Sequence, residues 1–143
     1  MLWITPLRAL ANNTLRSIKT AVDELCPWFS VDLRTGDSSQ STRKRQAEKL
    51  PTIFITTPES LSLMISYPGF EGRFRSLKVV VVDEWHELIG SKRGVLTELG
   101  LVRIRTVTKD IRLWGVSATL GNTKKALEVL LGRWSEEAVM IGS

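Results

Sequence analysis

The run Val79–Val82 constrains the fold most, because four consecutive valines lead directly into Asp83 and Glu84. A β-branched run without polar alternation is typical of a strand buried on both faces of a parallel sheet. Open α/β sheets bind ligands outside the carboxyl ends of their strands, which is where these two acids lie. Adjacent carboxylates suit a hard cation and a base that activates water. The alternative is a strand that ends in solvated acids, with His86 a surface or hydrogen-bonded core histidine.

Two Thr-Pro pairs each follow a short apolar segment: Thr5-Pro6 follows Leu2–Ile4, and Thr57-Pro58 follows Ile53–Thr56. Threonine caps the first backbone N–H groups of a helix, and proline fits its first position. We therefore expect Thr5 and Thr57 to cap helices. Because helix N-termini also attract anions, both positions are candidate phosphate sites, with simple capping as the alternative.

Strand patterns alternate with helical patterns along the chain. The predicted strands are Leu2–Ile4, 29–33, Ile53–Thr56, Val79–Val82 and 113–116, and another starts at 138–141. The predicted helices are 6–25, 43–50, 58–65, 95–107 and a short helix capped by Thr123. Such alternation is typical of right-handed crossovers in a parallel sheet. We predict a three-layer α/β fold, with a mostly parallel sheet flanked by helices.

Composition suits one globular domain, with 143 residues of which 43% are hydrophobic and 24% charged. The net charge of +5 favours a polyanionic partner. Cys26 is the only cysteine, which excludes an internal disulfide and a cysteine-rich metal site. The apolar runs are too short to span a bilayer, and the first residues do not resemble a signal peptide. We therefore expect a cytoplasmic protein that does not contact membranes.

A polar stretch separates the second and third predicted strands. Thr35-Gly36-Asp37 breaks the second strand, and glycine at position 36 allows a close backbone approach to a phosphate. The segment 43–50 carries a cluster of Arg and Lys residues with little apolar face. Such clusters are usually solvated surface, and we interpret this one in that way.

Five segments resemble, in the right order, the motifs of superfamily 2 helicases. They are Thr5-Pro6-Leu7-Arg8-Ala9-Leu10 (motif Ia), Thr35-Gly36-Asp37 (the Thr-Gly element), Thr57-Pro58-Glu59 (motif Ib), Asp83-Glu84-Trp85-His86 (the DExH box, motif II) and Ser117-Ala118-Thr119 (motif III). The continuation to Gly94 resembles the large helicase-related (Lhr) group, which includes ligase-associated DEXH helicases. The resemblance implies that residues 1–143 are part of the first RecA-like, ATP-binding domain of an ATP-dependent DNA helicase.

The resemblance also implies roles for the acidic segment, with ATP and Mg²⁺ as cofactors. Asp83 is expected to hold Mg²⁺ through water, and Glu84 to polarise the attacking water. His86 is expected to link the nucleotide site to motif III, here Ser117 and Thr119. We expect Trp85 to pack against a neighbouring helix rather than stack on a base.

A series of phosphate sites along one edge of a sheet would follow a nucleic-acid strand without reading its bases. The resemblance implies that the partner is single-stranded DNA, bound through its backbone. The expected contacts are Thr5, Pro6, Arg8, Thr35, Gly36, Thr57, Pro58 and Glu59.

The 143 residues contain no G-x-x-x-x-G-K-[ST] loop, which cradles the β- and γ-phosphates in this class. In the family this loop precedes motif Ia, and a second RecA-like domain supplies an arginine finger. We therefore expect an N-terminally truncated domain that does not hydrolyse ATP alone. The absent strand would leave an open sheet edge beside residues 113–116, which favours self-association or pairing with the segment around Val139.

Two other functions compete with a helicase motor. One is a non-catalytic module that binds single-stranded nucleic acid and derives from a helicase. The other is a metal-dependent phosphohydrolase that uses Asp83, Glu84, His86 and Glu87. Only one histidine is available and no second ligand cluster is evident, which disfavours the phosphohydrolase.

Overall fold

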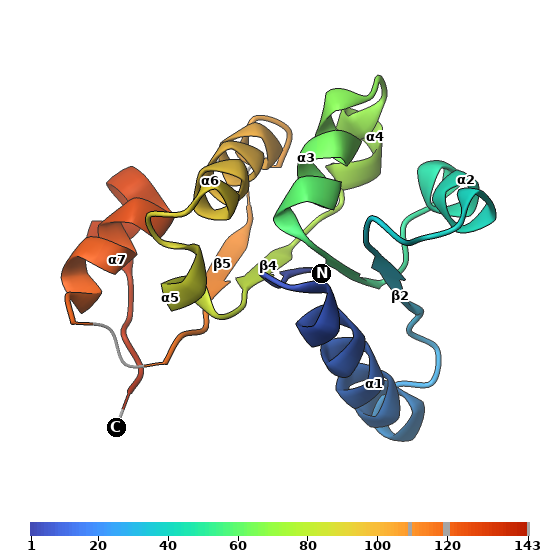
Figure 1. Cartoon of the computed structure of the whole chain (residues 1–143), viewed down its shortest axis with the longest axis horizontal. Helices are drawn as coiled ribbons and strands as arrows, with labels where there is room; N and C mark the ends of the chain where they lie inside the picture. The colour runs from blue at the N-terminus through green and yellow to red at the C-terminus, as the bar shows by residue number, and fades with distance from the viewer. Residues whose placement is uncertain (109, 119–120, 143) are drawn as a thin grey trace.

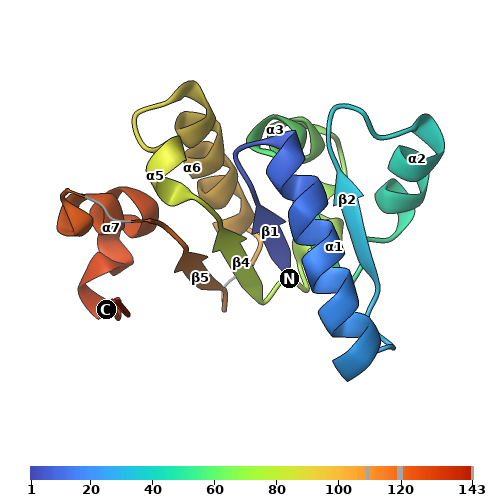
Figure 2. The same cartoon turned by 60° about the horizontal axis from the view of Figure 1, so that its bottom comes forward.

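Five parallel strands form one sheet in the order β2-β3-β1-β4-β5 (Figure 2). The computed structural model describes residues 1–108, 110–118 and 121–142. The strands are β1 Leu2–Ile4, β2 Val31–Arg34, β3 Ile53–Thr56, β4 Val79–Val82 and β5 Arg112–Gly115. The parallel sheet predicted from the alternation of strand and helix patterns is confirmed.

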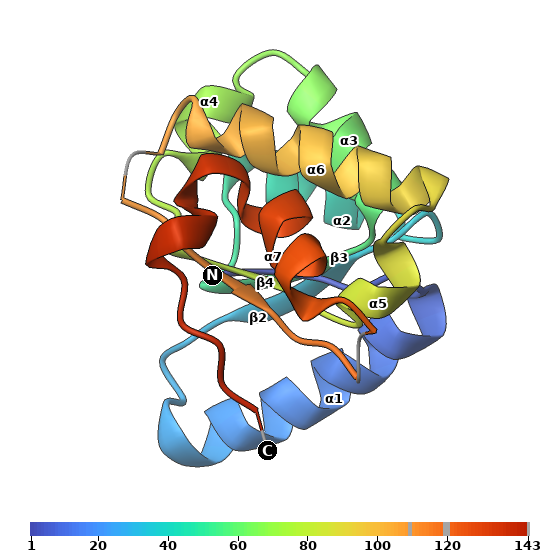
Figure 3. The same ribbon diagram turned by 90° about the vertical axis from the view of Figure 1, so that its left-hand side faces the viewer.

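Helices cover both faces of the sheet, which confirms the predicted three layers. Helix α1 lies on one face, and α3, α6 and α7 lie on the other (Figures 1 and 3). The helices are α1 Arg8–Leu25, α2 Gln40–Glu48, α3 Pro58–Ser66, α4 Phe70–Phe74, α5 Trp85–Leu88, α6 Lys92–Arg105 and α7 Thr123–Leu131, followed by the 3₁₀ helix η1 Gly132–Glu137. None of the described helices combines the length and apolar character needed to cross a membrane.

The main hydrophobic core lies between the sheet and the layer of α3 and α6. Side chains alternate along a strand, so Val80 and Val82 enter this core while Val81 faces the side of α1. All three are at most 6% exposed, which confirms that β4 is buried on both faces. Full burial of such a side chain stabilises the fold by about 1.5–3 kcal/mol.

Several predicted elements differ from the structure; α2 and α6, for example, each begin three residues earlier than predicted, at Gln40 and Lys92. Helix α1 begins at Arg8 rather than Pro6, because the Thr5 N–H still extends the sheet by donating to Thr56 O. Helix α7 is capped by Asn122, whose side chain accepts from the Lys125 N–H, and not by Thr123. The predicted strand at 138–141 does not form, and its apolar side chains are largely exposed.

Strand β5 lies at an edge of the sheet, as the sequence predicted. Trp114 is in register with Val81 and Trp3, so it shares their face of the sheet. Its 57% exposure shows that α1 does not extend over this end of that face. Self-association through this edge stays a prediction.

Gly94 allows α6 to begin directly against the end of α5. A Cβ atom at this position would lie 2.1 Å from the Leu88 carbonyl oxygen, a backbone atom that cannot move aside alone. The Ser91 side chain caps α6 at the same point by accepting from the Gly94 N–H at 3.1 Å. The glycine therefore fixes how closely α6 approaches the turn after β4.

We expect Gly94→Ala to lower the free energy of unfolding by about 1–3 kcal/mol, the cost of overpacking a filled site. Urea denaturation measures this change. Gly72→Ala is the matched control, because a Cβ there meets no atom within 4 Å. Equal stability of the two variants would show that α5 and α6 are not in tight contact.

Candidate functional site

The segments singled out in the sequence follow strands that all point the same way. The register places Ile4 beside both Thr56 and Val82, so the ends of β1, β3 and β4 are level. Arg34 is level with Thr56, and Gly115 with Val82. The residues that follow these five strand ends therefore form one edge of the sheet, which we call the carboxyl edge.

The carboxylate of Asp83 is oriented by two donors. Its Oδ2 accepts from Trp3 Nε1 at 3.1 Å, and its Oδ1 accepts from the Glu84 N–H at 3.0 Å. Each oxygen keeps a lone pair for another partner. Trp3 was missed in the sequence, because nothing in the local pattern shows that β1 pairs directly with β4.

Glu84 adopts a left-handed backbone conformation, with φ 48° and ψ 46°. It is the only non-glycine residue with positive φ in the described part of the chain. Such a conformation costs about 1–3 kcal/mol and persists only where the surroundings enforce it. Here the next residue enforces it, since the Trp85 N–H donates to Val116 O at 2.9 Å and the Trp85 side chain is buried.

Trp85 fixes this turn to the neighbouring helix. Its ring is 2% exposed, and Nε1 donates to Ala126 O of α7 at 3.0 Å. The prediction that Trp85 packs against a helix is confirmed. The turn that carries Glu84 and His86 is therefore anchored between β5 and α7.

His86 lies against the segment that follows β5. Its Nδ1 is 3.3 Å from both the Ser117 Oγ and the Ala118 N–H. Because a backbone N–H only donates, Nδ1 accepts from Ala118; the same nitrogen lies 3.4 Å from Glu84 Oε2, and Nε2 lies 3.6 Å from Glu87 Oε1. The structure thus brings His86 and Ser117 together, whereas Thr119 lies outside the described residues.

The acidic segment offers few ligands to a metal. Among the described residues, no three His, Cys, Asp or Glu side chains lie close enough together to hold an ion. Mg²⁺ commonly takes only one or two protein carboxylates, with waters and substrate phosphates completing its shell. The oriented carboxylate of Asp83 fits that type of site, whereas a dedicated metal cage does not fit.

The other half of the carboxyl edge forms a basic cleft of about 240 Å³. Its lining comes from the ends of β1, β2 and β3 and from α1, α2, α3 and α6. The lining residues are Pro6, Arg8, Arg34, Thr35, Gly36, Arg43, Thr57, Glu59, Ser60, Leu63 and Arg93. Segments that are far apart in the sequence therefore meet in one cleft.

Six of the eight residues expected to contact nucleic acid line this cleft; Thr5 and Pro58 do not. Both are buried, and the Thr5 hydroxyl donates to Leu7 O instead of facing solvent. Thr57 occupies the predicted N-cap position of α3, but its hydroxyl contacts Ser60 Oγ and caps no backbone N–H. Neither threonine provides the capping bond expected from the sequence.

Arg8 covers Gly36 and is held by Asp37. The Arg8 guanidinium donates to both carboxylate oxygens of Asp37, at 2.7 and 2.9 Å. A Cβ on residue 36 would lie 2.7 Å from Arg8 Nη2. The close approach that glycine permits is thus used by Arg8 in this structure.

Arg34, Arg43 and Arg93 line the cleft but were not singled out as site residues from the sequence. The basic cluster that begins at Arg43 is not simply solvated surface, which corrects the interpretation drawn from its composition. Arg43 donates to Gly36 O at 2.7 Å, and Arg45 pairs with Asp32 at 2.6 Å. The charge pattern was the available signal, but it does not show which of the basic residues face the sheet.

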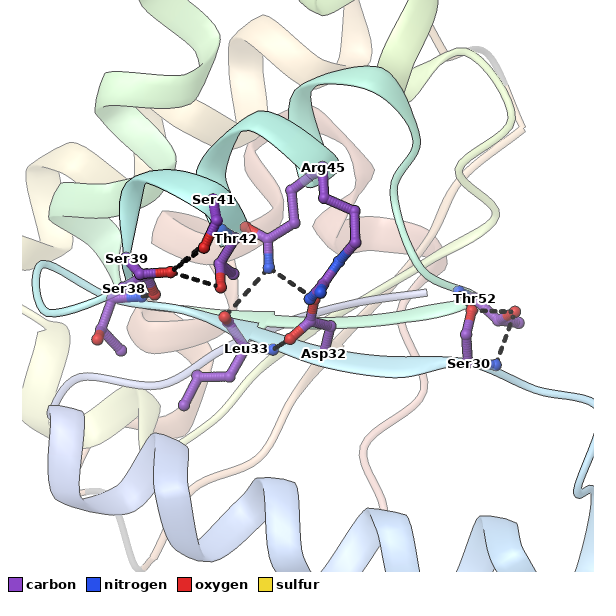
Figure 4. Close-up of polar contacts among 11 residues, drawn as sticks. Ser30, Asp32, Leu33, Ser38, Ser39, Ser41, Thr42, Arg45 and Thr52 are labelled. Atoms are coloured by element: carbon purple, nitrogen blue, oxygen red, sulfur yellow. Dashed lines mark hydrogen bonds and ion pairs between the residues drawn. The ribbon is translucent and has the colours of Figure 1, made fainter.

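Polar contacts hold α2 beside β2 (Figure 4). Asp32 Oδ2 accepts from both Arg45 and Gln46, and the Gln46 side chain also donates to Leu33 O at 3.2 Å. Ser39 caps the helix by accepting from the Thr42 N–H. These contacts replace the apolar face that α2 lacks, and they fix Arg43 over the cleft.

Asp32 makes the attachment of α2 sensitive to acid. Burial raises the pKa of Asp32, but hydrogen bonds from Gln46, Arg45 and the Leu33 N–H outweigh burial, so the pKa lies below its ordinary value of 3.8. A carboxyl group whose pKa is lower in the folded state stabilises the fold at pH values above its pKa in the unfolded state. This contribution is lost as the pH falls through the pKa of the folded state.

We expect Asp32→Asn to show a smaller loss of stability below about pH 3.8 than the wild-type chain, measured by urea midpoints from pH 6 to pH 2.5. Identical pH profiles for the two proteins would contradict this role.

Comparison with known proteins connects both parts of the carboxyl edge to one family. The family model of DEAD/DEAH box helicases matches residues 1–127. The chain belongs to this family. It is 33% identical over 142 residues to the ATP-dependent helicase Lhr-Core protein 2 of Thermococcus barophilus and 35% identical over 142 residues to the ATP-dependent helicase Lhr-Core of Methanocaldococcus jannaschii. Each alignment covers 92% of this chain but only 16% and 17% of the respective relative.

A solved structure of the Mycobacterium smegmatis helicase Lhr, bound to single-stranded DNA and AMP-PNP, is also similar. The TM-score is 0.85 and the identity 29%, over 92% of this chain and 18% of that chain. The predicted resemblance to Lhr-type helicases and the RecA-like fold are confirmed.

Proposed function

We propose that this chain is the part of a helicase motor domain that binds the backbone of single-stranded nucleic acid and carries the acidic residues for ATP hydrolysis. The observation that supports the proposal most directly is the basic cleft, where three strand ends and four arginines meet. DNA is the favoured partner, because the similar Mycobacterium smegmatis helicase was solved with single-stranded DNA.

The lining of the cleft suits a phosphate backbone rather than base readout. It contains no aromatic side chain on which a base could stack, within the described residues. Arginine forks match phosphate oxygens, and contacts of this kind position a strand without reading its sequence. We therefore assign the binding role to Pro6, Arg8, Thr35, Gly36 and Thr57, with Glu59 holding Arg93 in the lining and Thr5 and Pro58 supporting the cleft from behind.

The acidic half of the edge is assigned to nucleotide hydrolysis in the whole protein. Asp83 would hold Mg²⁺, which neutralises phosphate charge when bound, and Glu84 would accept the proton of the attacking water. His86 would connect this site to Ser117 and Thr119, and through them to a second RecA-like domain. The oriented carboxylate of Asp83 and the contact between His86 and Ser117 support these roles.

The chain should bind single-stranded oligonucleotides weakly, without sequence preference and with strong dependence on salt. Each phosphate contact contributes a slope of about −0.7 to the dependence of log K on log[salt] for single strands. Fluorescence anisotropy with labelled oligonucleotides of different sequence, between 25 and 200 mM salt, measures this slope. An affinity that does not change over that range would reject backbone binding.

We expect the isolated chain not to hydrolyse ATP, because phosphoryl transfer depends on a phosphate loop that its 143 residues lack. A steady-state assay with Mg²⁺ and single-stranded DNA tests this, with Glu84→Gln as the control for contaminating ATPases. Turnover that disappears in Glu84→Gln would show that the chain hydrolyses ATP without that loop. In the full-length protein, the same change should cut turnover by about 10²-fold while nucleotide binding persists.

A further inference from the structure

Arg34 is a buried cation that has no counter-ion within the described part of the chain. The residue is 6% exposed and lines the basic cleft. Among the described residues, its side chain has no carboxylate partner and makes no hydrogen bond. Charged side chains are rarely buried unless they are paired, because removing a charge from water is costly. An anionic ligand in the cleft is the partner that this position lacks.

Arg43 reaches the same cleft from α2. Its Nη2 donates to Gly36 O at 2.7 Å, which fixes the guanidinium over the turn after β2. Its Nε is buried and has no hydrogen-bond partner among residues 1–108, 110–118 and 121–142. Burial and the nearby charges of Arg43 and Arg73 lower the pKa of the Arg34 guanidinium, so Arg34 lies in a field of like charge.

The other two arginines of the cleft differ, because each is already neutralised by an acid. Arg8 pairs with Asp37, and Arg93 donates to Glu59 Oε1, both at 2.7 Å. A phosphate must compete with these carboxylates for Arg8 and Arg93. Of the residues that the structure describes, none places a carboxylate in competition for Arg34 or Arg43.

We infer that Arg34 and Arg43 form the principal phosphate-binding site of the cleft, and that Asp37 restrains Arg8 from contributing fully to binding. The inference rests on the proposed function and names the group in that cleft that carries most of the affinity. The ligand chemistry is the monoanionic pair of non-bridging oxygens of a phosphodiester, which fits a guanidinium fork. A strand of nucleic acid supplies such groups in series.

The first test compares Arg43→Gln with Lys44→Gln by fluorescence anisotropy, using a labelled oligothymidine of 12 nucleotides. Both variants lose one positive charge from the same helix, but Lys44 is exposed and does not line the cleft. Arg43→Gln should weaken binding by about 10-fold and reduce the salt slope by about 0.7. Lys44→Gln should change affinity by less than about 2-fold.

Arg34 is buried, so its variants need a control for folding. Arg34→Lys keeps the charge but loses the planar fork, and Arg34→Gln loses both. We expect both variants to bind more weakly than the wild-type chain, with the larger loss in Arg34→Gln. Their circular dichroism spectra should stay unchanged and their melting transitions cooperative. Should both variants unfold, Arg43→Gln alone decides.

Asp37→Asn tests the restraint on Arg8. Removing the carboxylate should raise affinity by about 2- to 5-fold, because a surface ion pair of this kind is weak and Arg8 becomes available. An oligothymidine with neutral methylphosphonate linkages tests the ligand chemistry. The wild-type chain and Arg43→Gln should not differ in their affinity for this ligand.

The outcomes separate this inference from the proposed function. If binding depends on salt but Arg43→Gln weakens it no more than Lys44→Gln does, the phosphate-binding site at Arg34 and Arg43 is overturned and the proposed function stays in place. An affinity of Asp37→Asn for the oligonucleotide that is unchanged or lower than that of the wild-type chain would overturn the proposed restraint on Arg8. If the wild-type chain shows no salt-dependent binding, both the phosphate-binding site and the proposed function are overturned.

Discussion

The parallel register of the sheet is the constraint on which the site depends. Strand β1 pairs with β3 on one side and β4 on the other, so it joins the basic cleft to the acidic segment. Backbone bonds continue past the strand ends, where the N–H groups of Thr5, Asp83 and Val116 donate to neighbouring strands. The Thr56 hydroxyl fixes β2 to β3 at the same level by donating to Arg34 O at 2.8 Å. A slip in this register would separate residues that lie far apart in the sequence.

The carboxyl edge is divided by charge. Four arginines line the cleft at the ends of β1, β2 and β3, and the end of β4 carries Asp83 and Glu84. A basic cleft attracts a polyanion, whereas adjacent carboxylates attract a cation. Each half also contains a group in an unfavourable state: Arg34 is buried without a carboxylate partner among the described residues, and Glu84 has a left-handed backbone conformation. Their costs are met by the packing of the sheet, by the polar attachment of α2 and by the anchoring of Trp85.

The sequence predicted the layers, the parallel sheet and the positions of its central strands, because β-branched runs and Thr-Pro pairs are strong local signals. Six of the residues that it singled out lie together in the cleft, and their contact with nucleic acid stays a prediction. It missed Trp3, Arg34 and Arg93, whose roles arise only when strands and helices pair across long separations. The segment 43–50 shows the same limit, since its composition cannot distinguish Arg43 in the cleft from exposed Lys44. The strand expected at 138–141 failed because apolar residues form a strand only where a neighbouring strand pairs with them.

The most direct test of this account is an amide chemical-shift titration of the ¹⁵N-labelled chain with a single-stranded oligonucleotide. The account predicts that the largest shifts cluster at residues 7–8, 34–37, 43, 57 and 59–60, which belong to four segments around the basic cleft. Shifts concentrated at the amino ends of the strands, or along α7 and the segment 138–142, would contradict it.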